Sequence, residues 1–326
     1  MYKIALEEHF GTPEIMKLRL DWFKRDNLPL NFSMEEAQRI GKLACDTAEF
    51  RLAEMDKHGI KKMILTPGSN GVDGVLDDQE ALEVCQRWNE AVYQEVKANP
   101  DRFDAFAMLP LRAPELAADE LERCVTKYGF KGCGWLAGYV YKCGFIDEEK
   151  FHPLFARAEK LGVPLYLHPT ETPNAFKAIY EGHPALLGPT WSWNTDTATY
   201  MLRIIFSGLL DKFPKTTIIM GHMGEMLPYV LWRVENRLEI NPMDVKLEKK
   251  LSQYFQDNIY ITTSGQFNNC ALRCAIEFCG AERIMFSIDY PFEPVDLACE
   301  FMDNASIPDD QKRLISHANA EKLLNL

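Results

Sequence analysis

Several features that mark large classes of protein are missing from this chain of 326 residues. No run of about 18 apolar residues occurs, so we expect no membrane-spanning helix. The first residues, MYKIALEEHF, carry two glutamates and begin an apolar strand pattern, which is not typical of a signal peptide. We therefore expect a cytoplasmic protein.

Excess positive charge is also missing. Lys and Arg total 36 against 48 Asp and Glu, which gives a net charge of −12. A chain this acidic is not expected to bind nucleic acid or an anionic membrane. It can still bind a small anion, because a buried metal ion or arginine sets the local field.

Three common ligand-binding signatures are missing as well. No G-x-G-x-x-G follows the first predicted strand and no G-x-x-x-x-G-K-[ST] occurs, so dinucleotide and P-loop sites are not expected. The nine cysteines include no Cys-x2-Cys pair, which argues against a cysteine-bound zinc ion. Cys270, Cys274 and Cys279 lie in a helical apolar pattern, and we interpret them as buried reduced thiols.

Short β-rich runs alternate with long amphipathic runs along the whole chain. Apolar residues at spacings of three and four indicate helices most clearly at residues 35–59, 78–100 and 113–129. The predicted strands cover residues 3–8, 62–66, 103–109, 130–136, 164–168, 217–221, 258–263 and 283–288.

This alternation predicts parallel strands joined by crossover helices. Eight such units in a chain of this length are typical of the α/β class and of a (β/α)8 (TIM) barrel, which we expect to form one domain over residues 1–326. A doubly wound open sheet is the alternative, since periodicity does not show whether the sheet closes.

Side chains that can bind metal gather at the ends of four predicted strands, where (β/α)8 enzymes place their active sites. They are Glu7 and His9 on the first strand, His168 on the fifth, His222 after the sixth and Asp289 after the eighth. Because residues two apart on a strand share a face, Glu7 and His9 can reach one ion while Glu8 points away. Two carboxylates and two imidazoles suit a divalent ion.

His222 is followed by Glu225 after a Met-Gly step. An imidazole that is oriented by a carboxylate acts either as a metal ligand or as a proton shuttle. The spacing leaves both roles open for His222.

Taken together, these segments resemble the amidohydrolase superfamily, and in particular its metal-dependent decarboxylases of γ-resorcylate (2,6-dihydroxybenzoate) and 2,3-dihydroxybenzoate. The matching segments are ALEEHF, NPDRFDAFAMLPL, YLHPT, GPTWSW, GHMGEMLPYVLWRVENR, ITTSG and FSIDYPFE, which keep the family's order nearly from end to end. The first strand carries Glu7-x-His9 where the superfamily's hydrolases carry His-x-His. The fourth strand has its lysine, Lys131, near its start, not at its end where a bridging lysine would stand. Both departures favour a site with a single metal ion.

The resemblance implies one divalent ion per chain, Mn2+ or Zn2+, with the ligands Glu7, His9, His168 and Asp289. It implies that His222 and Glu225 form an acid/base pair and that Arg233 lies near the substrate carboxylate or hydroxyl. It also implies a homo-oligomer, either a homotetramer or a homodimer.

The activity that we expect is non-oxidative decarboxylation of a hydroxybenzoate, of the 2,6- or 2,3-dihydroxybenzoate or salicylate type, reversible with bicarbonate. Proton donation by Asp289 to the ring carbon would let CO2 leave without an unstabilised carbanion, and a metal ion would stabilise an ortho phenolate. Such a small aromatic carboxylate needs a flat pocket, and the segments that could supply aromatic walls contain Trp22, Phe23, Trp191, Trp193, Tyr290 and Phe292.

Two other functions are compatible with the same residues. A hydrolase of a lactone or amide would use the same ligands to activate water. A binding protein without activity is the third hypothesis, and the metal-capable residues at four strand ends argue against it.

Overall fold

The computed structural model describes residues 1–28, 33–68 and 71–326. A strand is present at each of the eight predicted places: β1 (Lys3–Phe10), β2 (Ile60–Pro67), β3 (Phe103–Ala105), β4 (Cys133–Ala137), β7 (Leu165–His168), β8 (Ile218–Met220), β9 (Ile259–Thr262) and β10 (Ile284–Met285). Two short strands, β5 (Tyr139–Val140) and β6 (Gly144–Phe145), pair with each other antiparallel in the connection after β4.

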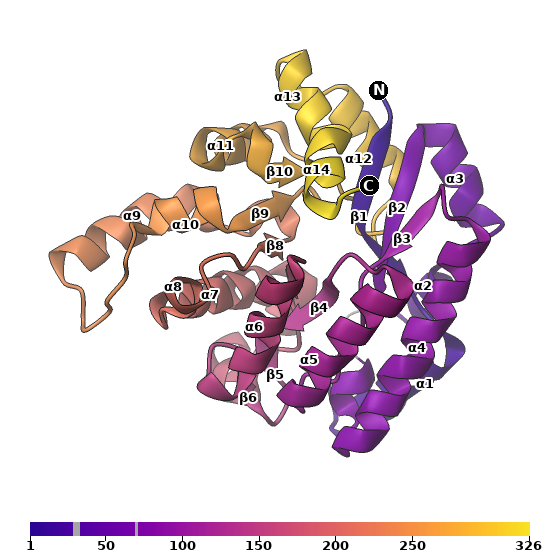
Figure 1. Cartoon of the computed structure of the whole chain (residues 1–326), viewed down its shortest axis with the longest axis horizontal. Coiled ribbons are helices and arrows are strands. Elements are labelled where there is room, and N and C mark those ends of the chain that lie inside the picture. The colour runs from indigo at the N-terminus through magenta and orange to yellow at the C-terminus, as the bar shows by residue number, and fades with distance from the viewer. Residues whose placement is uncertain (29–32, 69–70) are drawn as a thin grey trace.

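The eight main strands form a closed parallel array with helices around it (Figure 1). Hydrogen-bonded ladders run β1-β2-β3 and β10-β9-β8-β7-β4. Two isolated parallel bridges join these ladders, one between Ala107 and Cys133 and one between Glu8 and Tyr290. At the second seam the backbone N–H of His9 donates to the carbonyl of Tyr290 at 2.7 Å. The (β/α)8 barrel is confirmed, and the open sheet is excluded.

The helices cover the outside of the barrel (Figure 1). They are α1 (Pro13–Arg25), α2 (Met34–Ala44), α3 (Phe50–His58), α4 (Asp78–Ala98), α5 (Pro114–Arg123), α6 (His152–Leu161), α7 (Ser192–Phe206), α8 (Leu209–Lys212), α9 (Leu227–Ile240), α10 (Leu251–Asp257), α11 (Asn269–Cys279), α12 (Val295–Asp303), α13 (Asp309–Arg313) and α14 (Asn319–Leu324). Among the helices that the structure describes, none combines the length and the apolar character needed to cross a membrane.

The helical pattern predicted over residues 35–59 is interrupted in the structure, where α2 ends and α3 begins anew. The Asp46 carboxylate accepts hydrogen bonds from the backbone N–H groups of Glu49, Phe50 and Arg51, at 3.1, 2.8 and 3.0 Å. An aspartate side chain that satisfies free N–H groups favours a helix start. Apolar spacing continues across the break, which is why the pattern did not reveal it.

The strands β3 and β10 fall furthest short of their predicted lengths. In the segment after β3, the side-chain amide of Asn89 on α4 makes the backbone hydrogen bonds that a neighbouring strand would otherwise make. It donates to the carbonyl of Met108 and accepts from its N–H, both at 2.9 Å. A buried amide can therefore continue the pairing of an extended segment after its strand has ended.

An apolar cluster, which we call the floor, fills the barrel interior. Its members are Ile4, Leu6, Ile64, Phe106, Tyr166, Ile219, Met285, Ala320 and Leu324. The last two belong to α14, which packs against the end of the barrel where the strands begin. Beside it the two ends of the chain meet, because Tyr2 donates a hydrogen bond to Glu321 at 2.7 Å and stacks on His317.

Strand β1 contains an irregularity that decides which of its residues face the interior. Its pairing with β2 shifts register between Ala5 and Glu8, as at a β-bulge. The N–H groups of Leu6 and Glu7 both donate to the hydroxyl of Ser287, at 3.2 and 2.6 Å. The extra residue re-phases the strand, so that Leu6 joins the floor and Glu7 also reaches the interior above it.

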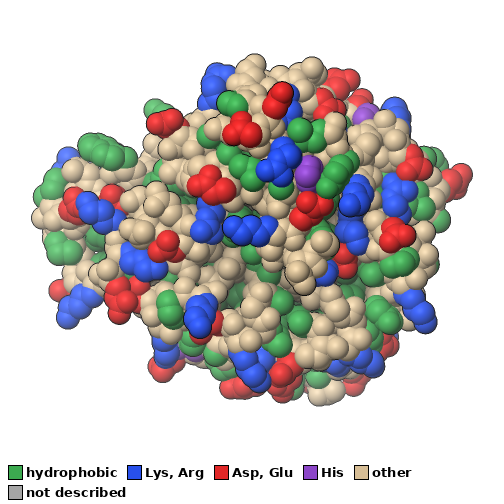
Figure 2. Space-filling view, turned by 45° about the horizontal axis from the view of Figure 1, so that its top comes forward, with side chains coloured by type: hydrophobic (Ala, Val, Ile, Leu, Met, Phe, Trp, Pro, Cys, Tyr) green, Lys and Arg blue, Asp and Glu red, His purple; other side chains and the backbone are tan. Residues whose placement is uncertain are grey.

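Helix α9 and the chain after it form an arm that projects from the barrel (Figure 1). Large apolar side chains are widely exposed on this arm, namely Tyr229, Trp232, Ile240 and Met243. Figure 2 shows hydrophobic side chains among charged ones on the arm, at the left of the view. The arm thus contributes surface to the molecule and little to its core.

Candidate metal centre and active site

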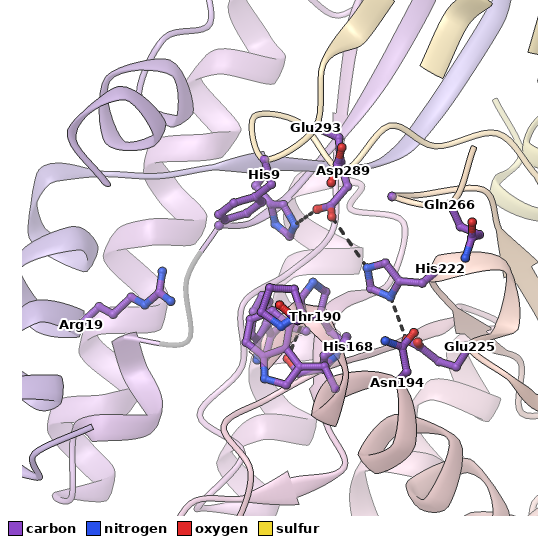
Figure 3. A pocket seen from close by; sticks show the side chains of 17 residues that line it. His9, Arg19, His168, Thr190, Asn194, His222, Glu225, Gln266, Asp289 and Glu293 are labelled. Atoms are coloured by element: carbon purple, nitrogen blue, oxygen red, sulfur yellow. Dashed lines mark hydrogen bonds and ion pairs between the residues drawn. The ribbon is translucent and has the colours of Figure 1, made fainter. Parts of the chain in front are cut away.

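A cavity of about 320 Å3 opens at the mouth of the barrel, where the strands end (Figure 3). The predicted site residues that line it are His9, His168, Trp193, His222, Glu225, Asp289 and Phe292. Glu7 is buried beneath them, with its carboxylate beside the imidazoles. The barrel therefore brings together residues that lie up to 285 positions apart in the sequence, as the numbers of Glu7 and Phe292 show (292 − 7).

The metal-capable atoms converge on one small volume. Glu7 Oε1 lies 3.1 Å from His168 Nε2 and 3.6 Å from His222 Nε2. His9 Nε2 lies 3.0 Å from Asp289 Oδ1. Two overlapping sets, Glu7 with His9 and His168, and Glu7 with His222 and Asp289, each keep their ligand atoms within 4.8 Å of one another. Five side chains could thus surround one ion.

Each of the three imidazoles is held so that Nε2 faces this volume. The Nδ1 atoms of His9 and His168 each contact a proline carbonyl oxygen, at 2.7 and 2.9 Å. Nδ1 of His222 contacts Glu225 Oε1 at 2.8 Å. Because an oxygen acceptor favours a proton on Nδ1, a neutral ring held in this way keeps the lone pair of Nε2 free to bind a metal ion.

The atoms at the centre fit a divalent cation. Glu7 Oε1 and His168 Nε2 are buried and have no hydrogen-bond partner among the described residues. Two lone pairs that face each other at 3.1 Å call for a positive charge beside them. Ligands about 2.1 Å from an ion, in adjacent octahedral positions, lie about 3.0 Å apart. The spacing and the donor types therefore match a metal site with carboxylate and imidazole ligands.

The electrostatics of the site keep Glu7 and His168 in their metal-binding forms. Burial raises the pKa of the Glu7 carboxyl, yet the surrounding imidazoles outweigh it and hold this pKa well below its ordinary value. Burial lowers the pKa of His168, which favours the neutral ring that binds metal. Burial also opposes a charge on His222, but the carboxylates of Glu225 and Glu7 raise its pKa well above the ordinary value.

A chain of hydroxyl groups supports Glu7 from below. Tyr166 donates a short hydrogen bond to Glu7 Oε2. Its oxygen lies 2.7 Å from the hydroxyl of Thr262, which lies 3.0 Å from that of Ser264. Since Tyr166 has one proton and gives it to Glu7, Thr262 donates to Tyr166 and Ser264 donates to Thr262. This chain fixes one carboxylate oxygen and leaves the other for the ion.

The backbone at the mouth is strained where it carries functional side chains. His222, Glu225 and Asp289 have φ angles of 49°, 54° and 79°, in the left-handed region that non-glycine residues rarely adopt. Such conformations cost about 1–3 kcal/mol each and cluster at functional sites. Gly221, before this turn, has no room for a side chain, because a Cβ atom there would lie 2.9 Å from Glu7 Oε2.

Comparison with known proteins decides the family. The amidohydrolase family model matches residues 38–326. The γ-resorcylate decarboxylase of Rhizobium sp. (strain MTP-10005) is 38% identical over 99% of this chain and 98% of the relative. This chain belongs to the amidohydrolase family. Within the family it belongs to the decarboxylase branch, as predicted from the sequence.

Solved structures agree with this assignment. A 2,6-dihydroxybenzoate decarboxylase in complex with 2,6-dihydroxybenzoate matches this amidohydrolase with a TM-score of 0.93 and 37% identity, covering 100% of both chains. The dihydroxybenzoic acid decarboxylase of Polaromonas sp. JS666, solved with manganese and 2-nitroresorcinol, matches with a TM-score of 0.92 and 37% identity, covering 100% of this chain and 97% of that one.

Three residues predicted to bind the substrate do not line the cavity of this amidohydrolase. Phe23 is buried in the core and packs edge-on against Trp22. Tyr290 is buried under the guanidinium of Arg51, which lies 4.4 Å from its ring centroid. Arg233 is exposed on the projecting helix α9, beside a second cavity of about 510 Å3. Within one chain, therefore, Arg233 does not reach the metal centre, because α9 runs away from the mouth.

Trp22 and Trp191, the other two aromatic residues considered as pocket walls, also do not line the cavity. Trp22 is buried against Phe23 and Tyr141, so it belongs to the core. Trp191 is exposed, while Trp193, two residues later, lines the cavity.

Several residues at the site escaped the sequence analysis. Trp135 of β4 stacks on His168, with ring centroids 3.7 Å apart and planes 22° apart. Arg51 of α3 donates to the carbonyl of His9 at 2.5 Å and so supports the end of β1 from behind. Arg19 of α1 lines the cavity. Tyr166 could have been found, since it stands two residues before His168 on one strand and must share its face.

Proposed function

We propose that this amidohydrolase removes CO2 from a 2-hydroxybenzoate without oxidation and releases the corresponding phenol. The reaction class is that of a carbon–carbon lyase. The proposal is carried by one metal centre at the strand ends in a chain that is 38% identical to a γ-resorcylate decarboxylase over 99% of its length. 2,6-Dihydroxybenzoate is the first substrate to test, because a neighbour with a TM-score of 0.93 was solved with it. 2,3-Dihydroxybenzoate and salicylate share its adjacent carboxylate and hydroxyl.

The site is built to hold one divalent ion. The proposed ligands are Glu7, His9, His168 and Asp289. Mixed carboxylate and imidazole ligands suit Mn2+ or Zn2+, and manganese is favoured because a decarboxylase at 37% identity holds it. When bound, the ion supplies Lewis acidity that stabilises the ionised hydroxyl beside the substrate carboxylate.

Asp289 is the proposed proton donor. It stands at the mouth between His9 and His222, with its two oxygens 3.0 and 3.8 Å from their Nε2 atoms. Its carboxyl proton adds to the ring carbon that bears the carboxylate. The bond to the carboxylate carbon then breaks, CO2 leaves, and the bonding electrons restore the aromatic ring. No carbanion in the ring plane has to form.

His222 and Glu225 are the proposed proton relay. Nε2 of His222 faces Asp289 while Glu225 holds its Nδ1, as the dashed lines in Figure 3 show. The overall reaction consumes one proton per substrate, so Asp289 must be reprotonated after each turnover. A partly exposed imidazole at the cavity wall can pass that proton from solvent to the carboxylate.

Aromatic side chains give the cavity the shape that a flat ring needs. Trp135, Trp193 and Phe292 line it, and the ring of Phe292 lies 5.1 Å from that of His9. Apolar walls exclude water from the substrate carboxylate, and this favours neutral CO2 over the charged group.

The deciding experiment follows the atoms of the solvent. Metal-loaded enzyme is incubated with a panel of 2-hydroxybenzoates in D2O and, separately, in water labelled with heavy oxygen. We expect release of CO2 and a phenol that carries deuterium where the carboxylate stood, with no labelled oxygen. Concentrated bicarbonate and the phenol should regenerate the acid. Opening of a lactone or amide with uptake of labelled oxygen, and no loss of CO2 from any hydroxybenzoate, would show a hydrolase instead.

A further inference from the structure

Arg19 on α1 contributes a positive charge to the cavity that the proposed chemistry does not use. It is the one Lys or Arg among the cavity-lining residues that the structure describes. Figure 3 shows it across the cavity from His222 and Glu225, reaching inward from its helix. The cavity therefore has an anionic, metal-binding end and a separate cationic wall.

No described residue lies within ion-pair distance of the Arg19 guanidinium. It forms no hydrogen bond or ion pair with any described residue, and its Nε atom is buried without a partner. Its Cζ atom lies 5.0 Å from the centroid of the Phe23 ring. Glu171 attracts it from beyond ion-pair distance, and Oε1 of Glu171 is itself buried without a partner. A buried donor without an acceptor costs free energy that a ligand can recover.

The chemistry of arginine indicates which chemical group of a ligand would bind at Arg19. Its planar fork matches a carboxylate through two parallel hydrogen bonds. That carboxylate is not the one that leaves, because Arg19 reaches the cavity from the wall opposite His222 and Glu225, away from the metal-binding end. The leaving carboxylate and the hydroxyl next to it belong at the metal end of the cavity. The group at Arg19 must therefore be a second acceptor that stays on the ring.

We infer that Arg19 determines substrate specificity by binding a second carboxylate, retained in the product, on the ring of a 2-hydroxybenzoate. The inference rests on the proposed decarboxylation for the orientation of the ring. The preferred substrate class is accordingly a hydroxybenzene dicarboxylate that loses only the carboxylate next to its hydroxyl.

The kinetic test compares substrates that differ only at the far side of the ring. Mn2+-loaded enzyme is assayed with salicylate and with salicylates that carry a carboxylate or a carboxamide at ring position 4 or 5. We expect kcat/KM for the better carboxylate to exceed that for its carboxamide by about tenfold to a hundredfold, the range of a charge-assisted hydrogen bond. Arg19→Gln should reduce this ratio to about one, by lowering kcat/KM for the carboxylate more than for the carboxamide or for salicylate.

Lys17→Gln is the matched control, because it removes a positive charge from the exposed face of the same helix. It should keep the full preference for the carboxylate. An unchanged preference in Arg19→Gln would overturn the inference. An equal loss for salicylate, the carboxylates and the carboxamides would also overturn it, since it would show a structural role for Arg19.

Binding of an inert dianion and of the matching monoanion separates this inference from the proposed function. Isophthalate and benzoate lack the hydroxyl that decarboxylation needs, and their binding to Mn2+-loaded enzyme can be followed by tryptophan fluorescence, since Trp135 and Trp193 line the cavity. We expect isophthalate to bind at least tenfold more tightly than benzoate, and only when Arg19 is present. If that holds while no hydroxybenzoate loses CO2, the carboxylate subsite stands and the decarboxylase proposal fails. If isophthalate has no advantage, the subsite is refuted whatever the enzyme decarboxylates.

Discussion

The floor and the mouth of the barrel are built on the same strands, yet they differ in almost every physical respect. The floor is apolar and closely packed, with Ile4, Ile64, Ile219 and Met285 all buried. The mouth, a few residues further along, carries facing lone pairs and left-handed backbone. The difference shows that the packing of the floor stabilises the fold enough to offset the charges and the backbone strain that the mouth holds ready for a ligand.

Tyr166 marks the boundary between these two regions. Its ring packs in the floor, while its hydroxyl donates to Glu7. Leu6 and Glu7 form a second boundary. Because of the bulge in β1, Leu6 packs in the floor while Glu7, the next residue, belongs to the mouth. Four substitutions, taken from the largest expected effect to the smallest, can break or sharpen this division.

His168→Ala should remove the metal ion and abolish turnover, because it deletes a neutral imidazole from the centre of the mouth. Elemental analysis of dialysed protein should find about one Mn2+ or Zn2+ per wild-type chain and almost none in the variant. His183→Ala, at an exposed histidine, is the control and should keep its ion. Full metal occupancy in His168→Ala would remove this residue from the ligand set.

Asp289→Asn should lower kcat by about 10²- to 10⁴-fold even in excess metal ion, the range for loss of a general acid. Asparagine keeps the size and an oxygen ligand but has no transferable carboxyl proton. Asp296→Asn changes an exposed aspartate nearby and should retain wild-type turnover. Near-normal kcat in metal-replete Asp289→Asn would transfer the role of proton donor to His222.

Ile219→Ala should affect stability and leave the metal centre intact. Ile219 is fully buried in the floor, and such a truncation lowers the free energy of unfolding by about 2–5 kcal/mol. Denaturant unfolding of the metal-free protein measures this loss, and elemental analysis should still find the ion. A variant of normal stability that had lost its ion would show that the floor and the mouth are not separable.

Tyr166→Phe should have the smallest effect. In contrast to Ile219→Ala, it should change metal binding and leave the stability of the fold intact. It keeps the floor packed but removes the proton that Tyr166 shares with Glu7, so metal affinity should fall by about 10- to 100-fold, as for other partners of a ligand. Competition with a chelator measures the affinity, and denaturant unfolding of the metal-free protein provides the control. A large loss of stability without a change in affinity would assign Tyr166 to the floor alone.

The sequence was most informative where a rule of short range applied. Period-two alternation paired Glu7 with His9, and strand ends located His168 and Asp289, because both arguments need only neighbouring residues. The bulge in β1 could not be predicted in this way. It depends on the hydroxyl of Ser287, 280 residues away along the chain.

The orientation of the helices was the other feature that the sequence could not predict. The resemblance directed attention to Arg233, whereas in the single chain Arg19 lines the cavity. Apolar spacing shows that α1 and α9 are helices, but it does not show where each one points once the barrel has closed. The length of β3 was also overestimated, because the pairing of Asn89 with Met108 replaces a ladder that an apolar run cannot distinguish from a strand.

The contact of Tyr2 with Glu321 has a practical consequence for handling the protein. Both ends of the chain lie beside the floor, on the side of the barrel away from the cavity. A tether fixed at either end would hold the molecule on a support with its entrance facing the solution. Immobilised enzyme, or a fluorescent fusion at either end, would thus leave the path of substrate and CO2 unobstructed.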